Sequence, residues 1–377
     1  MAIQKSNRNK NLIFNIVIFA VTIALVVVAA YLAGLKRYNS RALMVVYFVL
    51  GAIASGILHV VFHELGHLIA GKRNKMVLYA IRFFIISFVR TNGKLKYKTD
   101  MNFTTIGETV LLPVGNQNLV KRYSSVAMGG LMGSVVFCCL GIVGMAMVNY
   151  LPAIAYSFTS MVLPIGMYNL LTNALPMQME GSMNDGAIVH GAKRGDDTIK
   201  VAVNMLQVEA ELYQGKTFSE IDKSIYFDLP QLPETDLMFV TLLVNRYNYF
   251  LDLGDLEMAL KVSDRLYSLI DDLPKNVVRQ LKENFLYDAC VLKLNENDAD
   301  DFAAETEKAL NKDNSATGLR IKSAYLLYVV KDYDNARKFI EEGLKQAEKD
   351  TFKGNGRFES KLLLRLKEEL STRVEAE

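Results

Sequence analysis

Residues 59–67 of the chain read HVVFHELGH and close a long apolar run. His63 and His67 stand four positions apart, so on a helix both imidazoles project from one face and can bind the same zinc ion. Glu64 follows the first histidine and stays outside the ligand set, where its carboxylate can take a proton from a water that zinc has acidified. The pattern therefore predicts a metal site with Glu64 as the general base.

The surroundings of this motif decide between a metal site and a chance match, because short patterns of this kind recur on exposed helices. Here two histidines and a glutamate end an apolar span, where burying them for a purely structural purpose is costly. This setting favours the metal site. His59 lies one turn earlier on the same face. We expect it to pack beside the site, since a catalytic zinc usually has three protein ligands and an open position.

The composition indicates a membrane protein with a water-soluble part. The chain has 377 residues, of which 51% are hydrophobic, so it has room for two domains and is too apolar for an ordinary soluble enzyme. Residues 1–194 contain 18 Lys and Arg against 5 Asp and Glu, whereas the rest contains 25 against 35. This contrast is typical of a basic membrane domain followed by an acidic soluble one, and it does not suggest nucleic-acid binding.

Four apolar stretches are predicted to cross a bilayer. Residues 12–35 are uncharged and longer than the apolar part of a signal peptide, which favours a retained anchor. Residues 42–62 form the second stretch, and the uncharged residues 123–179 allow two more with a turn at 149–152. The N-terminus and residues 71–122 carry 3 and 10 Lys and Arg, against 3 in residues 36–41. This bias places the N-terminus and the motif on the cytoplasmic side.

A β-hairpin is predicted just after the motif. Thr91-Asn92-Gly93-Lys94 lies between strand-prone runs, and Asn-Gly is a strong signal for a tight hairpin turn. Residues 107–115 could add a strand. The edge of such a sheet could hold an extended peptide by strand addition, and a hairpin that only shields the site is an equally good interpretation.

A third ligand is expected near the end of the fourth span. With alternating crossings, residues 173–186 return to the membrane depth of His63 and His67. Asp185 is the natural candidate for a carboxylate ligand there. Glu180, which is followed by Gly181, is a competing acidic residue.

With these residues the membrane half resembles the site-2 protease family of intramembrane zinc metalloproteases. The family signature joins HExxH to an Asn-x-x-Pro run that leads to Asp-Gly. This chain has NALP at residues 173–176 and Asp-Gly at residues 185–186, and the resemblance covers about residues 42–190. It implies zinc bound by His63, His67 and Asp185, with Glu64 as general base and Asn173 near the scissile peptide.

The chain departs from the family in two places. The spacing between Pro176 and Asp185 is longer than the commonest form, which keeps Glu180 in competition. The middle core span has Gly129-Gly130 and Ser134 where the family often has Gly-Pro and a later Asn. Small residues four apart, such as Gly129 and Gly133, predict close helix packing in this span.

The remainder of the chain is predicted to be a soluble helical domain. Residues 249–260 and 328–337 are similar to the helix–turn–helix junctions of tetratricopeptide repeats, and residues 292–304 offer a degenerate copy. The alternative is an unrelated array of helical hairpins. In either case we expect a cytoplasmic binding or regulatory domain, whose helices could dock a protein partner.

The predicted fold class is mainly α. It is a polytopic membrane protein with about four transmembrane helices and a small β-hairpin or sheet near the active site, followed by a soluble α-helical repeat-like domain. The expected domains are residues 1–41, an anchor span and loop; 42–194, a metalloprotease core; and 195–377, the helical domain.

The expected function is that of a Zn²⁺-dependent endopeptidase in a bacterial plasma membrane, with both termini cytoplasmic. Its expected substrate is a membrane protein or membrane-inserted peptide, cut in or near a spanning segment. One alternative is a membrane-anchored helical-repeat adaptor with a vestigial or structural metal site. Another is a different integral-membrane HExxH enzyme, such as a prenyl-protein protease, which would take a glutamate as its third ligand.

Overall fold

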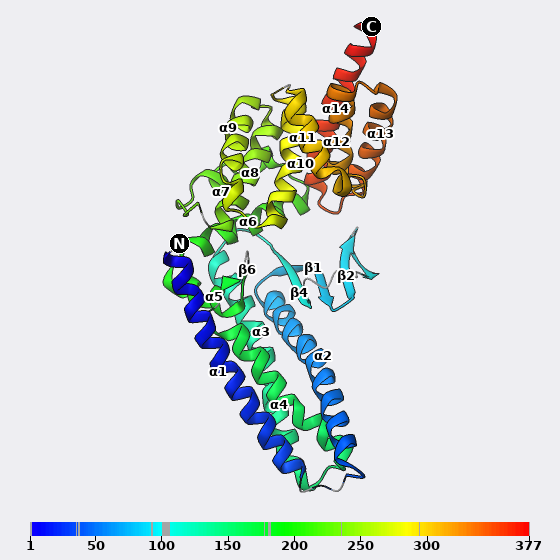
Figure 1. Cartoon of the computed structure of the whole chain (residues 1–377). Coiled ribbons are helices and arrows are strands. Elements are labelled where there is room, and N and C mark those ends of the chain that lie inside the picture. The colour runs from blue at the N-terminus through cyan, green and yellow to red at the C-terminus, as the bar shows by residue number, and fades with distance from the viewer. Residues whose placement is uncertain are drawn as a thin grey trace. The chain divides into compact units, whose positions relative to one another are not determined.

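The computed structural model describes residues 2–34, 36, 38–91, 93–99, 106–176, 178–179, 182–234, 236–293 and 295–376 (Figure 1). The chain forms two compact units, an N-terminal unit of residues 1–199 and a C-terminal unit of residues 200–377. This division falls five residues after the predicted boundary at 194. The predicted anchor span belongs to the N-terminal unit, where it packs against the fourth span.

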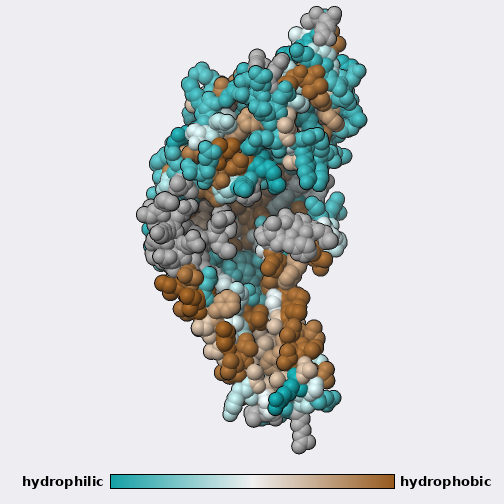
Figure 2. Space-filling view, viewed as in Figure 1, coloured by the Kyte–Doolittle hydropathy of each residue, from teal (hydrophilic) through white to brown (hydrophobic). Residues whose placement is uncertain are grey.

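Four helices of the N-terminal unit are long and apolar enough to cross a membrane, as the sequence predicted. Their outer faces carry many exposed apolar side chains, and Figure 2 shows hydrophobic surface along this helical bundle. Ser40 caps the second helix by accepting a hydrogen bond from the Leu43 amide, and Pro152 precedes the fourth. The helices are α1 (Ala2–Ala33), α2 (Arg41–Arg73), α3 (Leu119–Ala146) and α4 (Ala153–Ala174).

Glycines let the α2 and α3 backbones touch. A Cβ atom on Gly66 would lie 2.2 Å from the carbonyl oxygen of Gly129, and one on Gly133 would lie 2.3 Å from that of Phe62. No larger residue fits at such a crossing without moving a helix. The close packing predicted from Gly129 and Gly133 is therefore confirmed, and it fixes α3 directly against the turns of α2 that carry the motif.

A four-stranded antiparallel sheet follows α2, in the order β3-β2-β1-β4. The predicted hairpin is its β2–β3 pair. Gly93 has the positive φ of 78° that the turn requires, while Asn92 lies outside the described residues. The β4 strand sits at one edge of the sheet and packs against α2. The strands are β1 (Met76–Phe83), β2 (Ile86–Thr91), β3 (Lys94–Thr99) and β4 (Gly107–Pro113).

Short connections join α3 to α4 and α4 to the next helix. Between α3 and α4 there is a single turn of 3-10 helix, Met147–Asn149, which overlaps the predicted turn at 149–152. After α4 come the two-residue strands β5 (Gln178–Met179) and β6 (Ser182–Met183), and then α5 (Asp185–Arg194). The α5 helix packs against α3 and α4, and so begins beside the bundle.

The C-terminal unit is helical and has its own apolar core. Chain reversals occur at two of the predicted junctions, with positive φ at Gly254 between α8 and α9 and at Lys331 before α13. The third predicted junction, residues 292–304, covers the connection between α10 and α11 and the first part of α11; these two helices pack against each other, and one residue of the connection lies outside those described. The helices are α6 (Asp197–Gln214), α7 (Ser224–Phe227), α8 (Leu237–Leu253), α9 (Leu256–Tyr267), α10 (Lys275–Val291), α11 (Glu296–Leu310), α12 (Ala316–Tyr325), α13 (Tyr333–Lys349) and α14 (Lys353–Ala376), with a π-helical segment at Leu326–Val330.

Candidate metal centre

Three side chains from two helices converge on one point. His63 Nε2 and His67 Nε2 on α2 lie 3.1 Å apart. Asp185 Oδ2, at the start of α5, lies 3.1 Å from the first nitrogen and 3.4 Å from the second. The sequence predicts that these residues share one site, although Asp185 is more than 100 positions from the histidines. The structure brings them together as a group that could hold a metal ion.

The separations match the edges of a coordination polyhedron. A tetrahedral ion with bonds of about 2.0–2.1 Å has ligand atoms about 3.3 Å apart, and an octahedral one about 3.0 Å. Two of the observed separations, both 3.1 Å, fall in this range, and the third, 3.4 Å, exceeds the tetrahedral value by about 0.1 Å. The donor set therefore fits a small divalent cation at the centre of His63, His67 and Asp185.

The hydrogen bonds of the imidazoles support this geometry. His67 Nδ1 lies 2.8 Å from the carbonyl oxygen of Val126, which only accepts, so this nitrogen carries the hydrogen and Nε2 of the neutral ring carries the lone pair. Asp185 Oδ2 is buried and accepts no hydrogen bond from the described residues. A lone pair on His67 Nε2 and a buried carboxylate oxygen that face each other are a donor pair that could hold a cation.

The facing helix leaves room for the centre. A Cβ atom on Gly130 of α3 would lie 2.4 Å from the His67 ring and 2.9 Å from Asp185 Oδ2. Glycine is therefore the residue that this position accommodates without moving a ligand. His67 and Asp185 occupy the space that any larger residue would fill.

A cap holds Asp185 in place. Asn184 accepts a hydrogen bond from the Ala187 amide, which makes it the N-cap of α5. Its Nδ2 donates to the carbonyl oxygens of Thr172 and Leu175 at 2.7 and 2.6 Å, at the end of α4. Asn184 therefore joins the end of one helix to the start of the next and sets the position of Asp185.

The residue after Asp185 is equally constrained. A Cβ atom on Gly186 would lie 2.1 Å from the carbonyl oxygen of Ala174. Glycine is therefore required after Asp185 in this chain, because only a residue without a Cβ atom lets α5 begin so close to the last turn of α4.

Glu64 is buried beneath the sheet. Thr109 Oγ1 on β4 donates to Glu64 Oε2 at 2.6 Å, and a Cβ atom on Gly107 would lie 2.6 Å from Glu64 Oε1. The β4 strand thus covers the carboxylate and orients one of its oxygens. The sequence predicted a strand here but gave no sign that Thr109 would contact Glu64.

The remaining predicted residues fall in different places. Asn173 is partly buried near the end of α4, and its Nδ2 lies 3.3 Å from the carbonyl oxygen of Asn169. Glu180 lies outside the described residues. His59 is buried at 2% exposure and is not part of the three-residue group; its Nε2 lies 3.0 Å from Ser134 Oγ, which matches the expectation that it packs beside the site.

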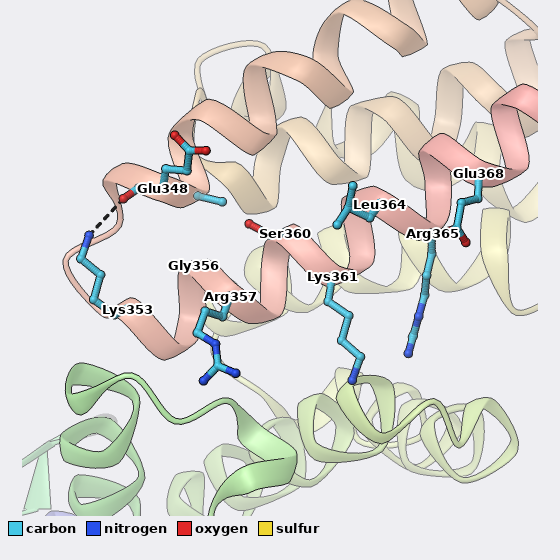
Figure 3. A pocket seen from close by; sticks show the side chains of 10 residues that line it. Glu348, Lys353, Gly356, Arg357, Ser360, Lys361, Leu364, Arg365 and Glu368 are labelled. Atoms are coloured by element: carbon cyan, nitrogen blue, oxygen red, sulfur yellow. Dashed lines mark hydrogen bonds between the residues drawn. The ribbon is translucent and has the colours of Figure 1, made fainter.

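The C-terminal unit has a groove along α14 (Figure 3). Four basic side chains spaced four residues apart line it; Arg357, Lys361 and Arg365 point the same way in this view, and Lys353 turns toward Glu348. Each already bonds within the unit, so the row fastens α14 to neighbouring segments. Arg357 pairs with Glu220 at 2.7 Å, Lys361 with Asp252 at 3.0 Å, Arg365 with the Leu251 carbonyl oxygen at 3.0 Å, and Lys353 with that of Glu348 at 3.0 Å.

Comparison with known proteins gives no match to a family model, a curated protein or a solved structure.

Proposed function

We propose that the chain is a zinc-dependent intramembrane endopeptidase that cuts a membrane protein or membrane-inserted peptide in or near a spanning segment. The observation that carries this proposal is the convergence of His63, His67 and Asp185. Both histidines and the adjacent Glu64 lie on α2, a helix long and apolar enough to cross a membrane. The resemblance of the two motifs to the site-2 protease family supports the same reaction.

Zinc is the metal that best suits two imidazoles and one carboxylate with a further position left open. His63, His67 and Asp185 would hold it. When bound, the ion supplies a Lewis acid that polarises a peptide carbonyl and acidifies water. Glu64 accepts the proton of the attacking water and passes it to the leaving amine, and Thr109 keeps the carboxylate oriented for both transfers.

The sheet suggests how a substrate is held. A spanning helix must unwind before its peptide bonds are accessible to a base. The β4 strand lies at a sheet edge and contacts Glu64, so an extended substrate segment aligned with this strand would pass close to the carboxylate. In the proposed orientation the motif and both termini face the cytoplasm, as the distribution of Lys and Arg favours.

Replacing the base without disturbing the metal tests the proposal. Glu64→Gln should bind zinc as the wild type does but lose cleavage by about 10²–10⁴-fold, because an amide cannot accept the proton. The measurements are zinc content of the purified protein and a comparison of membrane peptides that accumulate in cells with either form. Glu108→Gln, at an exposed carboxylate on the same strand as Thr109, is the matched control.

Full cleavage by Glu64→Gln would refute the peptidase mechanism. If the His63→Ala protein kept full cellular function while loss of residues 200–377 abolished it, the membrane-anchored adaptor would replace the enzyme.

A further inference from the structure

Ser134 on α3 connects two histidines of α2. Its Oγ lies 2.9 Å from His63 Nδ1 and 3.0 Å from His59 Nε2. All three residues are buried, with exposures of 8%, 0% and 2% for His63, Ser134 and His59. The bridge therefore exists where water does not readily replace a lost partner.

The orientation of this bridge controls whether His63 can bind a cation. His63 Nε2 faces Asp185 and His67, so it must carry a lone pair to act as a ligand. The ring hydrogen must then be on Nδ1, and Ser134 Oγ must accept it. If Ser134 donated to Nδ1 instead, a hydrogen would occupy Nε2 and point into the centre.

His59 gives the Ser134 hydroxyl hydrogen another acceptor. Within α3 the hydroxyl lies 3.2 Å from the Gly130 carbonyl oxygen, and His59 Nε2 is nearer at 3.0 Å. A hydroxyl that donates to His59 or Gly130 is left to accept from His63. The rings of Phe137 and His59 pack edge to face, with centroids 5.5 Å apart, which helps to hold His59 in reach of Ser134.

One face of α3 carries all three groups that contact the histidine ligands. Val126, Gly130 and Ser134 are four residues apart and share one face. The first supplies a carbonyl to His67, the second leaves space for the ligands, and the third supplies a hydroxyl to His63. One helix face thus sets the tautomers of both imidazoles.

We infer that Ser134, itself held by His59, is the positioning residue that fixes the metal-binding tautomer of His63. This inference rests on the proposed metal centre, and it adds two residues that act through the ligand without touching the metal.

Zinc affinity tests the inference without any need for a substrate. Full-length protein in detergent is titrated with Zn²⁺ against a chromophoric chelator, and Co²⁺ absorption reports the ligand geometry. Ser134→Ala should bind zinc about 10- to 100-fold more weakly, the usual effect of removing a partner of a ligating histidine, and should alter the Co²⁺ spectrum. His59→Leu should have a smaller effect, and His59→Gln, which keeps a polar group in reach of Ser134, should restore affinity.

The matched control is Ser160→Ala. Ser160 is also fully buried in a membrane-length helix, but its hydroxyl bonds to the Ser157 carbonyl oxygen of its own helix at 3.3 Å. This variant should bind zinc as the wild type does, which separates the role of Ser134 from the general effect of removing a buried hydroxyl. The thermal stability of each zinc-free variant is compared with that of Ser160→Ala to exclude misfolding.

The outcomes separate the two ideas. Wild-type affinity in Ser134→Ala would overturn the inference and leave the metal centre standing. A further loss from His59→Leu in the Ser134→Ala background would show that His59 does not act through Ser134. A wild-type protein that takes up no zinc would overturn both the inference and the proposed function.

Discussion

Single residues around His63 and His67 explain why the two helices that carry the site can form it. Gly66, Gly129 and Gly133 allow the α2 and α3 backbones to touch, and Gly130 leaves the space that His67 and Asp185 occupy. Larger side chains at these positions would separate the helices or displace a ligand. The centre therefore requires glycine at these four positions as well as the three side chains that could bind the ion.

Gly130→Ala tests this reading. The added methyl would meet the His67 ring at 2.4 Å and Asp185 Oδ2 at 2.9 Å, so zinc content should fall well below that of the wild type. Overpacking of this kind also costs about 1–3 kcal/mol of stability. Gly56→Ala on α2 is the control, because a Cβ there meets nothing within 4 Å. If Gly130→Ala bound zinc at full affinity, α3 would not define the site.

At the scale of elements, the centre depends on a junction between two helices. His63 and His67 share one rigid helix, but Asp185 arrives on α5 after a reversal of the chain. The amide of Asn184 bridges that reversal by bonding to the last carbonyls of α4 and capping α5. The position of the third ligand, Asp185, therefore depends on the hydrogen bonds of Asn184.

Asn184→Ala should loosen the third ligand and leave the histidines in place. Loss of an N-cap costs about 1 kcal/mol, and the two further hydrogen bonds contribute about 1 kcal/mol each, so zinc affinity should fall about tenfold or more. Chelator competition measures the change. Asn204→Ala removes a partly buried side chain whose amide donates to the Lys200 carbonyl oxygen of its own helix, α6, and should leave zinc binding unaltered. Equal affinity in both variants would contradict a role for the cap.

The sequence predicted the elements better than it predicted their contacts. Helical periodicity places His63 and His67 on one face, and charge-free length marks the four long helices, because both are local properties. The side-chain contacts of the site join distant segments: Thr109 bonds to Glu64, Ser134 bonds to His63, and Asn184 bonds to the end of α4. A single threonine, serine or asparagine carries no local sequence pattern that predicts such a contact. In the sequence Ser134 stands out only as a departure from the family motif.

At the scale of the whole molecule, the division of charge coincides with a division of structure. The basic first half forms the unit with the apolar helices, and the acidic second half forms a unit with a separate core. That second core contains buried polar groups of its own. Asp288 on α10 accepts hydrogen bonds from Tyr247 on α8 and Ser263 on α9, and so joins three helices.

Asp288 should make the C-terminal unit sensitive to pH. Burial raises the pKa of its carboxyl to about 6, although hydrogen bonds from Ser263 and Tyr247 oppose the shift. The folded state therefore holds the proton of Asp288 more tightly than the unfolded chain does. The contribution of the protonated carboxyl to the free energy of unfolding is complete below about pH 4 and is lost as pH rises through 6, a change of up to about 3 kcal/mol.

Asp288→Asn resembles the protonated form and should remove this dependence. Urea unfolding of the full chain is followed by circular dichroism of the C-terminal transition. The difference in stability between the wild type and Asp288→Asn should be level above about pH 7, and the wild type should lose stability relative to Asp288→Asn as pH rises from about 4 to 7. A constant difference between the two proteins across this range would show that Asp288 does not titrate there.

The length of α2 has a consequence for how water is supplied. With 33 residues at about 1.5 Å each, this helix extends about 50 Å, whereas the hydrocarbon layer is about 30 Å thick. His63 and His67 occupy its last three turns. In the proposed orientation the proposed hydrolytic site therefore lies close to the headgroups, and a short inlet from the cytosol would suffice in place of a channel through half the bilayer.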